Sequence, residues 1–415
     1  MSSIVGFFKR VFTALNPPPA QPSAESAPIK FGILGAAAIA PISLITPAKN
    51  HPEVVVYAVA ARDQNRAAAF AKKHGIGKVY GGPNGYQELL DDPEIDAIYN
   101  PLPNGLHYEW TMKALAAGKH VLLEKPSADT AEETRQLFDL AEKKGLVLLE
   151  AFHYRFHPSI QRVKAIITSG ELGAIKHIST TLAVPKGAIR SGDIRYDYSL
   201  GGGALMDMGC YTLDCIRYLS SSNPVSVTSA SHDLYKPASA PPSFKPDVDR
   251  GTTATFVLPN DATAALKCDL SVPYGYGIIP SMPQVTASIM CEGGEISVNN
   301  FLMPTLYHSI KVSKKDGQGT KTRVEKVYTF AEGNMEGKGE AWWTTYRFQL
   351  EAFVDKVKGR TPQTWIDKED SIANMQWIEE IYAKTGLGSR PKSTFVLASE
   401  AGSDSAAPPT SESPA

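Results

Sequence analysis

The chain has 415 residues, which is long enough for two domains with separate hydrophobic cores. Its 42 basic and 43 acidic side chains nearly cancel, so the composition gives no indication of a nucleic acid or an anionic membrane as partner. Four scattered cysteines form neither a CxxC pair nor a disulfide framework, which is typical of a reducing compartment, and we expect a cytoplasmic location. No apolar run reaches the roughly 18–20 residues that span a bilayer, so no membrane span is expected.

The first 28 residues differ in texture from the rest of the chain. Residues 4–15 carry apolar side chains at helical spacing, which predicts a short amphipathic helix that packs on the folded body. A proline-rich linker follows up to residue 28. No acidic residue precedes Glu25, so a mitochondrial presequence is the minority alternative. At the other end, residues 399–415 are rich in Ser, Ala and Pro, which predicts a disordered tail.

The stretch 30–40, KFGILGAAAIA, predicts a buried strand that runs directly into a helix. The spacing of its small residues is a degenerate form of the dinucleotide-binding pattern G-x-G-x-x-G/A, with alanine in place of the second glycine. A backbone with so few side chains can approach a pyrophosphate, and the helix N-terminus adds free N–H groups and a positive dipole end. The residues of this candidate cofactor turn are Gly35, Ala36, Ala37, Ala38, Ile39 and Ala40.

Strand and helix patterns alternate from this turn to residue 152. Further strands are predicted at 54–61, near 79, and at 97–100, 120–124 and 146–150, with helical stretches between them. Alternation at this pitch is typical of right-handed βαβ units, so residues 29–152 are predicted to form a parallel-sheet Rossmann domain.

Beyond residue 152 the pattern changes to longer segments rich in Thr and Val. We expect a helix at 158–169, then strands at 177–184, 225–234, 252–258, 264–272 and 285–298, and finally helices at 342–358 and 369–384. These segments predict an α+β domain over residues 153–398, built on an open, mainly antiparallel sheet. The active site is then expected in the cleft between the domains, at the carboxyl ends of the parallel strands.

The end of the second strand decides which dinucleotide is bound. Arg62 can pair with a 2′-phosphate, which favours NADP. Asp63 follows it and would serve the ribose of NAD if the strand ended slightly later, so NAD is the less favoured alternative.

Two further stretches carry candidate chemistry. Glu124, Lys125 and Pro126 follow a buried strand at its carboxyl end, which places the lysine at the cleft. Asp207 and Tyr211 come after a run of three glycines and are four residues apart, so we expect them to share one helix face among apolar neighbours.

Other polar residues are weaker candidates. His153 and His157 have the spacing of helical metal ligands, but Pro158 follows and no third ligand is apparent, so no metal site is expected. Arg155 lies just past the last parallel strand and is a candidate substrate residue. Arg195 and Tyr196 are further candidates for the substrate wall.

Four stretches together resemble the Gfo/Idh/MocA oxidoreductase family, in particular its dimeric dihydrodiol dehydrogenase and fungal NADP-dependent D-xylose dehydrogenase branch. They are GILGAAAIA, NPLPNGLH, GKHVLLEKP and LGGGALMDMGCY, and the resemblance covers roughly residues 30 to 395. It implies that Lys125 is catalytic and that Asp207 and Tyr211 lie at the substrate. It also implies a cis Lys–Pro peptide bond, cofactor contacts from Leu102, Asn104 and His107, and a homodimer formed through the sheet of the second domain.

The chemistry of these residues agrees with the resemblance. Oxidation of an alcohol needs a base for the O–H proton while the C–H hydrogen leaves as hydride to the nicotinamide. A tyrosine is a poor base at neutral pH, but a neighbouring ammonium would lower its pKa, so we expect Lys125 and Tyr211 to act as a pair. Asp207 would orient the lysine or the substrate.

The resulting prediction is an NADP-dependent dehydrogenase that oxidises D-xylose at C1 to the 1,5-lactone. The same residues would also suit oxidation of a trans-dihydrodiol or reduction of a dicarbonyl. A non-catalytic NADP-binding regulator is the alternative of another class, and the presence of Lys125, Asp207 and Tyr211 argues against it.

Overall fold

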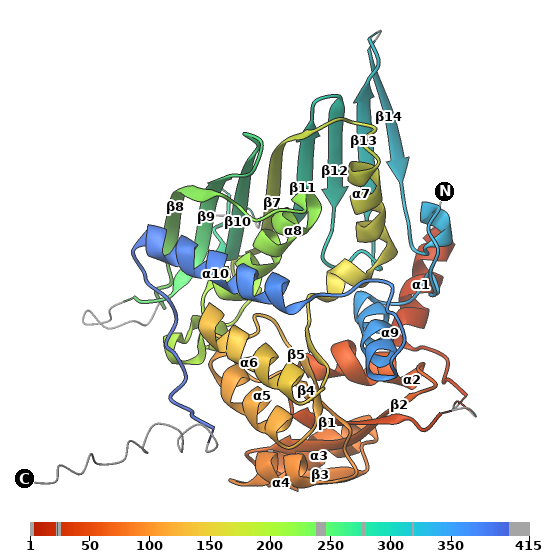
Figure 1. The fold of residues 1–415 in the computed structure, drawn as a ribbon, viewed down its shortest axis with the longest axis vertical. Helices are drawn as coiled ribbons and strands as arrows, with labels where there is room; N and C mark the ends of the chain where they lie inside the picture. The colour runs from red at the N-terminus through yellow and green to blue at the C-terminus, as the bar shows by residue number, and fades with distance from the viewer. Residues whose placement is uncertain are drawn as a thin grey trace, which may run out of the picture.

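The computed structural model describes residues 4–21, 23, 26–237, 246–275, 279, 281–317 and 319–397. It contains two sheets with helices between and around them (Figure 1). The predicted tail at 399–415 lies outside the described residues. Within the described ranges, no helix combines the length and the apolar composition that a membrane span needs.

The first sheet has six parallel strands in the order β3-β2-β1-β4-β5-β6. They are β1 (Ile29–Leu34), β2 (Val54–Ala61), β3 (Lys78–Gly81), β4 (Ala97–Asn100), β5 (His120–Leu123) and β6 (Leu148–Glu150). From β1 the strand order runs to one edge of the sheet through β2 and β3, and then to the other edge through β4, β5 and β6. The switch point lies between β1 and β4, which is where parallel α/β sheets bind their ligands. The predicted Rossmann fold is confirmed.

Helices connect these strands and cover both faces of the sheet. They are the π-helical turn η1 (Pro41–Ile45) with α2 (Thr46–Lys49), α3 (Gln64–His74), α4 (Gly85–Asp91), the 3₁₀ turn η2 (Asn104–Leu106), α5 (His107–Ala116) and α6 (Ala131–Lys143). Helix α6 begins with a capping box, since the Thr130 hydroxyl accepts from the backbone N–H of Glu133 at 3.3 Å.

The second sheet has eight strands in the order β14-β13-β12-β11-β7-β10-β9-β8. They are β7 (Ile175–Pro185), β8 (Ser226–Leu234), β9 (Asp249–Val257), β10 (Thr263–Val272), β11 (Gln284–Cys291), β12 (Gly294–Asn299), β13 (Ser309–Lys315) and β14 (Thr320–Glu325). Only β7 and β10 pair in parallel, so the sheet is mainly antiparallel, as predicted.

Two features of this sheet differ from the sequence-based prediction. The expected strand at 285–298 is a hairpin of β11 and β12, because the chain turns after Cys291 and pairs it with Gly294. The strands β13 and β14 were not predicted at all. They are rich in Lys, Thr and Ser and lie at the sheet edge, where alternation of apolar side chains is weak.

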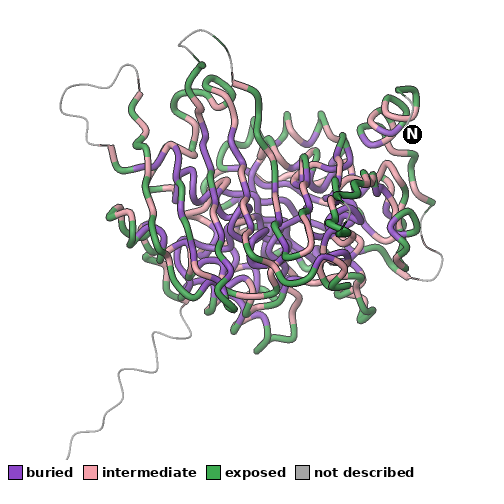
Figure 2. Tube along the Cα trace, turned by 90° about the horizontal axis from the view of Figure 1, so that it is seen from above, coloured by how far each residue is buried: buried purple, intermediate pink, exposed green. Residues whose placement is uncertain are grey.

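Helices α8 (Cys210–Ser220) and α10 (Lys368–Thr385) pack on one face of this sheet, and α7 (Pro158–Thr168) lies on the same side (Figure 1). Helix α9 (Thr345–Val357) links the sheets, since the rings of Phe353 and Phe31 of β1 lie 5.6 Å apart. It begins three residues later than expected, after the Thr344 cap. Figure 2 shows buried segments running through the middle of the molecule, where one apolar core reaches both sheets.

The predicted N-terminal helix is present as α1 (Ile4–Leu15). The Arg10 guanidinium of this helix donates to the carbonyl oxygen of Thr305 at 2.9 Å. It also stacks on the ring of Tyr328, 3.7 Å from the ring centre. The helix therefore packs on the folded body, as the sequence predicted.

Candidate active site

A cavity of about 370 Å³ opens at the carboxyl ends of the parallel strands, between the first sheet and the second. Its first wall comes from the loops after β1, β4 and β5. These residues are Ile39, Pro101, Leu102, Asn104, His107, Glu124 and Lys125. The opposite wall comes from the part of the chain that follows the parallel sheet. It includes Leu182, Val184, Ile194, Arg195, Asp207, Met208, Tyr211, Val285, Leu302, Met303 and Tyr346. The cleft expected from the order of the strands is therefore present.

The turn after β1 has the backbone that a dinucleotide needs. Gly35 has a φ of +87°, and a Cβ atom there would lie 3.1 Å from the Leu102 side chain. Ala36, Ala37, Ala38 and Ile39 continue the turn, and Ala40 leads into the helix formed by η1 and α2. The residues present thus leave room for a pyrophosphate beside the helix N-terminus.

The end of β2 favours a cofactor with a 2′-phosphate. Asp63 caps α3, because its carboxylate accepts from the backbone N–H of Arg66 at 2.6 Å. Arg62 is exposed beside it. The guanidinium of Arg66 donates to the carbonyl oxygen of Ala36 at 3.2 Å, so a second cation stands at the glycine turn. Sequence reasoning missed Arg66, although its position one turn into the helix after β2 was a readable signal.

His107 connects two loops of the cofactor wall. Its ring nitrogens lie 2.7 Å from the carbonyl oxygen of Leu102 and 2.7 Å from that of Pro126. Burial lowers the pKa of His107 to about 4. The peptide bond between Lys125 and Pro126 is cis, as the resemblance implies. Asn104 reaches across the cleft and donates to the carbonyl oxygen of Gly201 at 2.9 Å.

Glu124 is held within the first wall. The Tyr99 hydroxyl donates to its carboxylate at 2.6 Å, and the hydroxyls of Tyr99 and Ser43 also lie 2.6 Å apart. Burial raises the pKa of Glu124 above its ordinary value. The glutamate thus fixes the end of β5 from which Lys125 projects.

Lys125, Asp207 and Tyr211 meet in the cavity. The Lys125 ammonium donates to the Asp207 carboxylate at 3.1 Å and to the Asp207 carbonyl oxygen at 2.9 Å. It also lies 4.9 Å from the centre of the Tyr211 ring. Asp207 belongs to a π-helical turn, η6 (Leu205–Gly209), and Tyr211 belongs to α8, which follows it directly. Both residues line the same cavity, although the helix type changes between them.

Arg195 joins this cluster from the short 3₁₀ turn η4 (Ile194–Tyr196). Its guanidinium donates to the second oxygen of the Asp207 carboxylate at 2.8 Å and pairs with Asp193 at 2.9 Å. The Asp207 carboxylate therefore pairs with two cations, and Asp193 supplies the second negative charge of the cluster. Although burial alone would raise the pKa of Asp207, these two cations hold it below its ordinary value.

The protonation of the cluster differs from the sequence-based expectation. Burial would lower the pKa of Lys125, but the Asp207 carboxylate raises it overall. The pKa of Tyr211 is not lowered by the lysine. Burial raises it well above the ordinary value of tyrosine. Among the described residues the Lys125 ammonium donates its hydrogen bonds to Asp207, while its distance to the centre of the Tyr211 ring is 4.9 Å. At neutral pH both groups therefore carry their protons.

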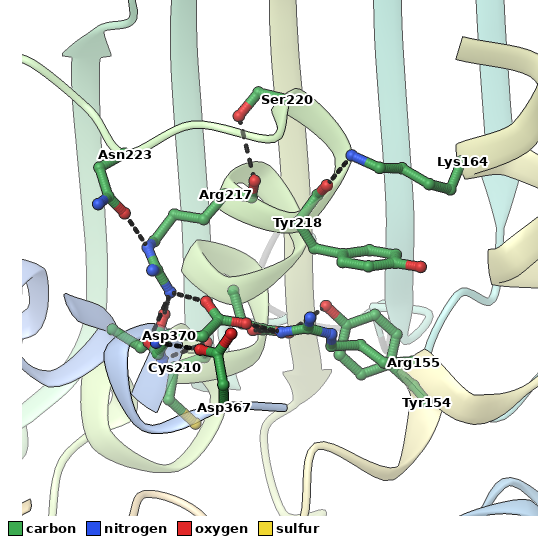
Figure 3. A network of polar contacts seen from close by, with 12 residues as sticks. Tyr154, Arg155, Lys164, Cys210, Arg217, Tyr218, Ser220, Asn223, Asp367 and Asp370 are labelled. Carbon is green, nitrogen blue, oxygen red and sulfur yellow. Dashed lines mark hydrogen bonds and ion pairs between the residues drawn. The ribbon is translucent and has the colours of Figure 1, made fainter. Parts of the chain in front are cut away.

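The structure places Arg155 away from the cavity, which corrects the prediction that it contacts substrate. Arg155 lies in the 3₁₀ turn η3 (His153–Phe156) and forms ion pairs with Asp214 of α8, at 3.0 Å, and with Asp370 of α10. Figure 3 shows its guanidinium directed at Asp370, and Arg155 is not among the residues that line the cavity. These ion pairs connect η3 to α8 and α10, so Arg155 has a structural role.

Tyr196 also does not line the cavity. Its ring stacks on Tyr235 with centroids 3.7 Å apart and an interplanar angle of 9°. This stack holds the loop that carries Arg195. Within the described residues, no group of three or more His, Cys, Asp or Glu side chains could hold a metal ion.

Two cavity residues were not predicted as substrate contacts. The sequence pattern indicates only a metal-ligand spacing for His153 and a helix without a site role for Tyr346. Both line the cavity beside Tyr211. His153 could have been found from its position just past β6, the same signal that singled out Arg155. Nothing local marks Tyr346, because only the packing of α9 on the first sheet brings it to the site.

The comparisons with known proteins agree with this geometry. A family model described as "Oxidoreductase family, NAD-binding Rossmann fold", of the Gfo/Idh/MocA group, matches residues 29–152, and the Gfo/Idh/MocA C-terminal domain matches residues 160–297. A relative named D-xylose 1-dehydrogenase (NADP(+)) 2, from Haloferax volcanii, is 32% identical over 363 residues, which is 86% of this chain and 98% of the relative.

Other relatives act on different substrates by name. The trans-1,2-dihydrobenzene-1,2-diol dehydrogenase of Xenopus tropicalis is 36% identical over 48% of this chain and 59% of its own. A solved 3-ketoreductase from Actinomadura kijaniata, in complex with NADP and TDP-benzene, has a TM-score of 0.69 and 25% identity, covering 86% of this chain and 98% of its own. Levoglucosan dehydrogenase, with a TM-score of 0.72 and 21% identity over 88% of this chain and 100% of its own, shares the fold.

Proposed function

Since the chain belongs to the Gfo/Idh/MocA oxidoreductase family, we propose that it is an NADP-dependent D-xylose 1-dehydrogenase that oxidises D-xylose at C1 to D-xylono-1,5-lactone. The observation that carries the proposal is the meeting of Lys125, Asp207 and Tyr211 at the carboxyl edge of the parallel sheet. The relative from Haloferax volcanii supports the choice of substrate, because the alignment spans nearly all of both chains.

NADP is the cofactor that fits the first wall. The turn from Gly35 to Ala40 would hold the pyrophosphate, and the loops at Leu102, Asn104, His107 and Glu124 to Pro126 would surround the nicotinamide half. Arg62 and Arg66 would bind the 2′-phosphate, because the Asp63 carboxylate is occupied as a helix cap. Bound NADP supplies the acceptor for the hydride that leaves C1.

Lys125 and Tyr211 handle the proton of the reacting hydroxyl in this proposal. Lys125, held by the Asp207 carboxylate, provides a positive charge beside the oxygen on which negative charge develops. The hydroxyl of Tyr211 exchanges the proton with that oxygen. Asp207 and Arg195 fix the lysine, and Arg195 borders the substrate space.

Reduction of a carbonyl compound, or oxidation of a trans-dihydrodiol, is the second candidate. A specific observation favours the reduction: Lys125 and Tyr211 both keep their protons at neutral pH, which suits donation of a proton to a nascent alkoxide. The apolar wall of Leu182, Val184, Val285 and Leu302 would also suit a carbocyclic substrate.

The first experiment measures NADPH formation by the purified protein with NADP⁺ and D-xylose, beside the Lys125→Met variant. We expect turnover that disappears in the variant. No turnover with D-xylose, while a dihydrodiol or a dicarbonyl reacts, would refute the xylose proposal and leave the enzyme class. Binding of NADP without turnover of any of these substrates would favour a non-catalytic regulator.

We also propose that the protein is a cytoplasmic homodimer joined through the open face of the eight-stranded sheet. Exposed Thr253 and Thr255 of β9 and exposed Met290 of β11 lie on this sheet. A wide two-sided sheet with helices packed on one face gains stability when a second copy covers the other. Sedimentation equilibrium tests this, and a monomer at micromolar concentration would contradict it.

A further inference from the structure

We infer that His153 and Tyr346, together with Tyr211, form an uncharged subsite that binds a second hydroxyl group of the substrate, beside the one that reacts. The inference rests on the proposed function, since it concerns the substrate of the same site. It narrows the substrate class to polyols, namely aldoses and cyclic vicinal diols, and excludes simple alcohols.

The two side chains are fixed in place by elements far apart in the sequence. His153 begins η3, directly after β6, and Tyr346 lies in the first turn of α9. Their rings lie 4.0 Å apart, and the ring of His153 also meets Tyr211 edge-on at 5.6 Å. The hydroxyl of Thr345 lies 2.8 Å from Nδ1 of His153, which orients the imidazole. Such preorganisation is what a recognition site requires.

Three polar atoms of this group have no hydrogen-bond partner among the described residues, and the residues that carry them line the cavity. Within the described chain, neither Nε2 of His153 nor the hydroxyls of Tyr211 and Tyr346 make a hydrogen bond. All three residues line the cavity, and none of these atoms is among the buried polar atoms sealed from solvent. The three residues are at least nine-tenths buried overall, so the solvent reaches these atoms only through the cavity, where a substrate hydroxyl can take the place of water as their partner.

The charge of the subsite defines what it binds. His153 is neutral, since burial and the nearby Lys125 lower its pKa to about 3. Burial raises the pKa of both tyrosines, so they are neutral as well. The charged groups are paired among themselves, since Lys125 and Arg195 form ion pairs with Asp207 and Arg195 also pairs with Asp193. A neutral imidazole and two phenols match a neutral hydroxyl, which both donates and accepts a hydrogen bond.

The wall across the cavity completes the match. Leu182, Val184, Val285, Leu302 and Met303 present apolar surface to the same space. A pyranose or a cyclic diol has hydroxyl edges and a C–H face, so it can satisfy both walls at once. The site therefore suits a ring with at least two adjacent hydroxyls.

The test compares substrates that differ by one hydroxyl: D-xylose with 2-deoxy-D-xylose, and trans-1,2-cyclohexanediol with cyclohexanol. We expect the native protein to prefer the hydroxylated member by at least about 100-fold in kcat/KM, because a site built for a hydroxyl rejects an analogue that lacks it. In Tyr346→Phe and in His153→Leu this preference should fall at least about tenfold, mainly through KM. Tyr328→Phe removes a phenol hydroxyl outside the cavity and serves as the matched control.

The outcome separates the subsite from the proposed function. Turnover with an unchanged preference in both variants would overturn the inference and leave the activity. If no pair is turned over, calorimetric binding of the same compounds to the NADPH-loaded protein reads the subsite directly. If the native protein binds the hydroxylated compound of each pair more tightly and the variants lose this preference, the subsite is supported although the proposed function fails. Equal binding of the two compounds of a pair by the native protein refutes the subsite. Thermal unfolding of each variant excludes a general loss of fold.

Discussion

The ion pair between Lys125 and Asp207 controls the proton chemistry of the site, and the Asp207→Asn substitution isolates it. The change keeps the shape of the side chain and removes its negative charge. Lys125 then retains the burial that lowers its pKa and the positive charge of Arg195, but loses the carboxylate that raises it. Its pKa must therefore fall.

The geometry sets the size of the effect. At 3.1 Å and an effective dielectric constant of about 20, the attraction between the two charges is roughly 5 kcal/mol. Part of this offsets the cost of burying the charges, and Arg195 shares the same carboxylate. If only a third remains, the substitution still costs about 1.5–2 kcal/mol, which corresponds to a loss of roughly 10- to 30-fold in kcat/KM.

The assay is the pH dependence of kcat/KM for carbonyl reduction with NADPH. If the protonated lysine is the active form, the rate falls as pH rises through the pKa of Lys125. Because that pKa is lowered in Asp207→Asn, the alkaline limb should move to lower pH by about one unit or more. In the oxidation direction the rate of the native protein should rise toward alkaline pH, since Lys125 and Tyr211 are protonated at neutral pH.

Asp193→Asn is the matched control, because Asp193 pairs with Arg195 but makes no ion pair with Lys125 in the described chain. We expect a smaller shift there. An alkaline limb that stays in place in Asp207→Asn, in a protein that still binds NADPH and unfolds at the native temperature, would refute the reasoning.

Three further substitutions test other parts of the structure. Arg62→Ala should lower the preference for NADP over NAD by roughly 10- to 100-fold, because a charge-assisted contact to the 2′-phosphate is lost, and KM values for both cofactors check this. Arg155→Met leaves Asp214 buried without its cation and should cost about 3–5 kcal/mol of unfolding free energy in urea. The activity per folded molecule of this variant should stay at the native level. A variant that is as stable as the native protein but inactive would show that Arg155 belongs to the active site. Asp129 is buried without a hydrogen bond for either carboxylate oxygen among the described residues, and burial raises its pKa to about 7. The folded state thus resists its ionisation, so native stability falls as pH rises from about 4 to 7. Asp129→Asn should therefore stabilise the protein by roughly 2–4 kcal/mol at pH 8 and hardly at pH 4, and an equal effect at both pH values would contradict this.

The parallel sheet and its cofactor turn could be predicted because their signals are local. The apolar run before Gly35 and the alternation of strand and helix patterns each depend on a few neighbouring residues. The rule that ligands bind at the carboxyl ends of parallel strands then placed Lys125 at the cleft. Asp207 and Tyr211 could be singled out because polar residues stand there within an apolar helix.

Only the tertiary structure decided which of the remaining polar residues belong to the site. Arg155 and His153 are two residues apart, yet one is bound by acids of α8 and α10 and the other faces the cavity. Tyr346 reaches the site because α9 packs between the sheets. The protonation of Tyr211 likewise depends on its burial, which is decided by the elements that pack around it. Sequence periodicity reports which side chains are buried, but partners more than 50 residues away determine the charge and direction of each polar group.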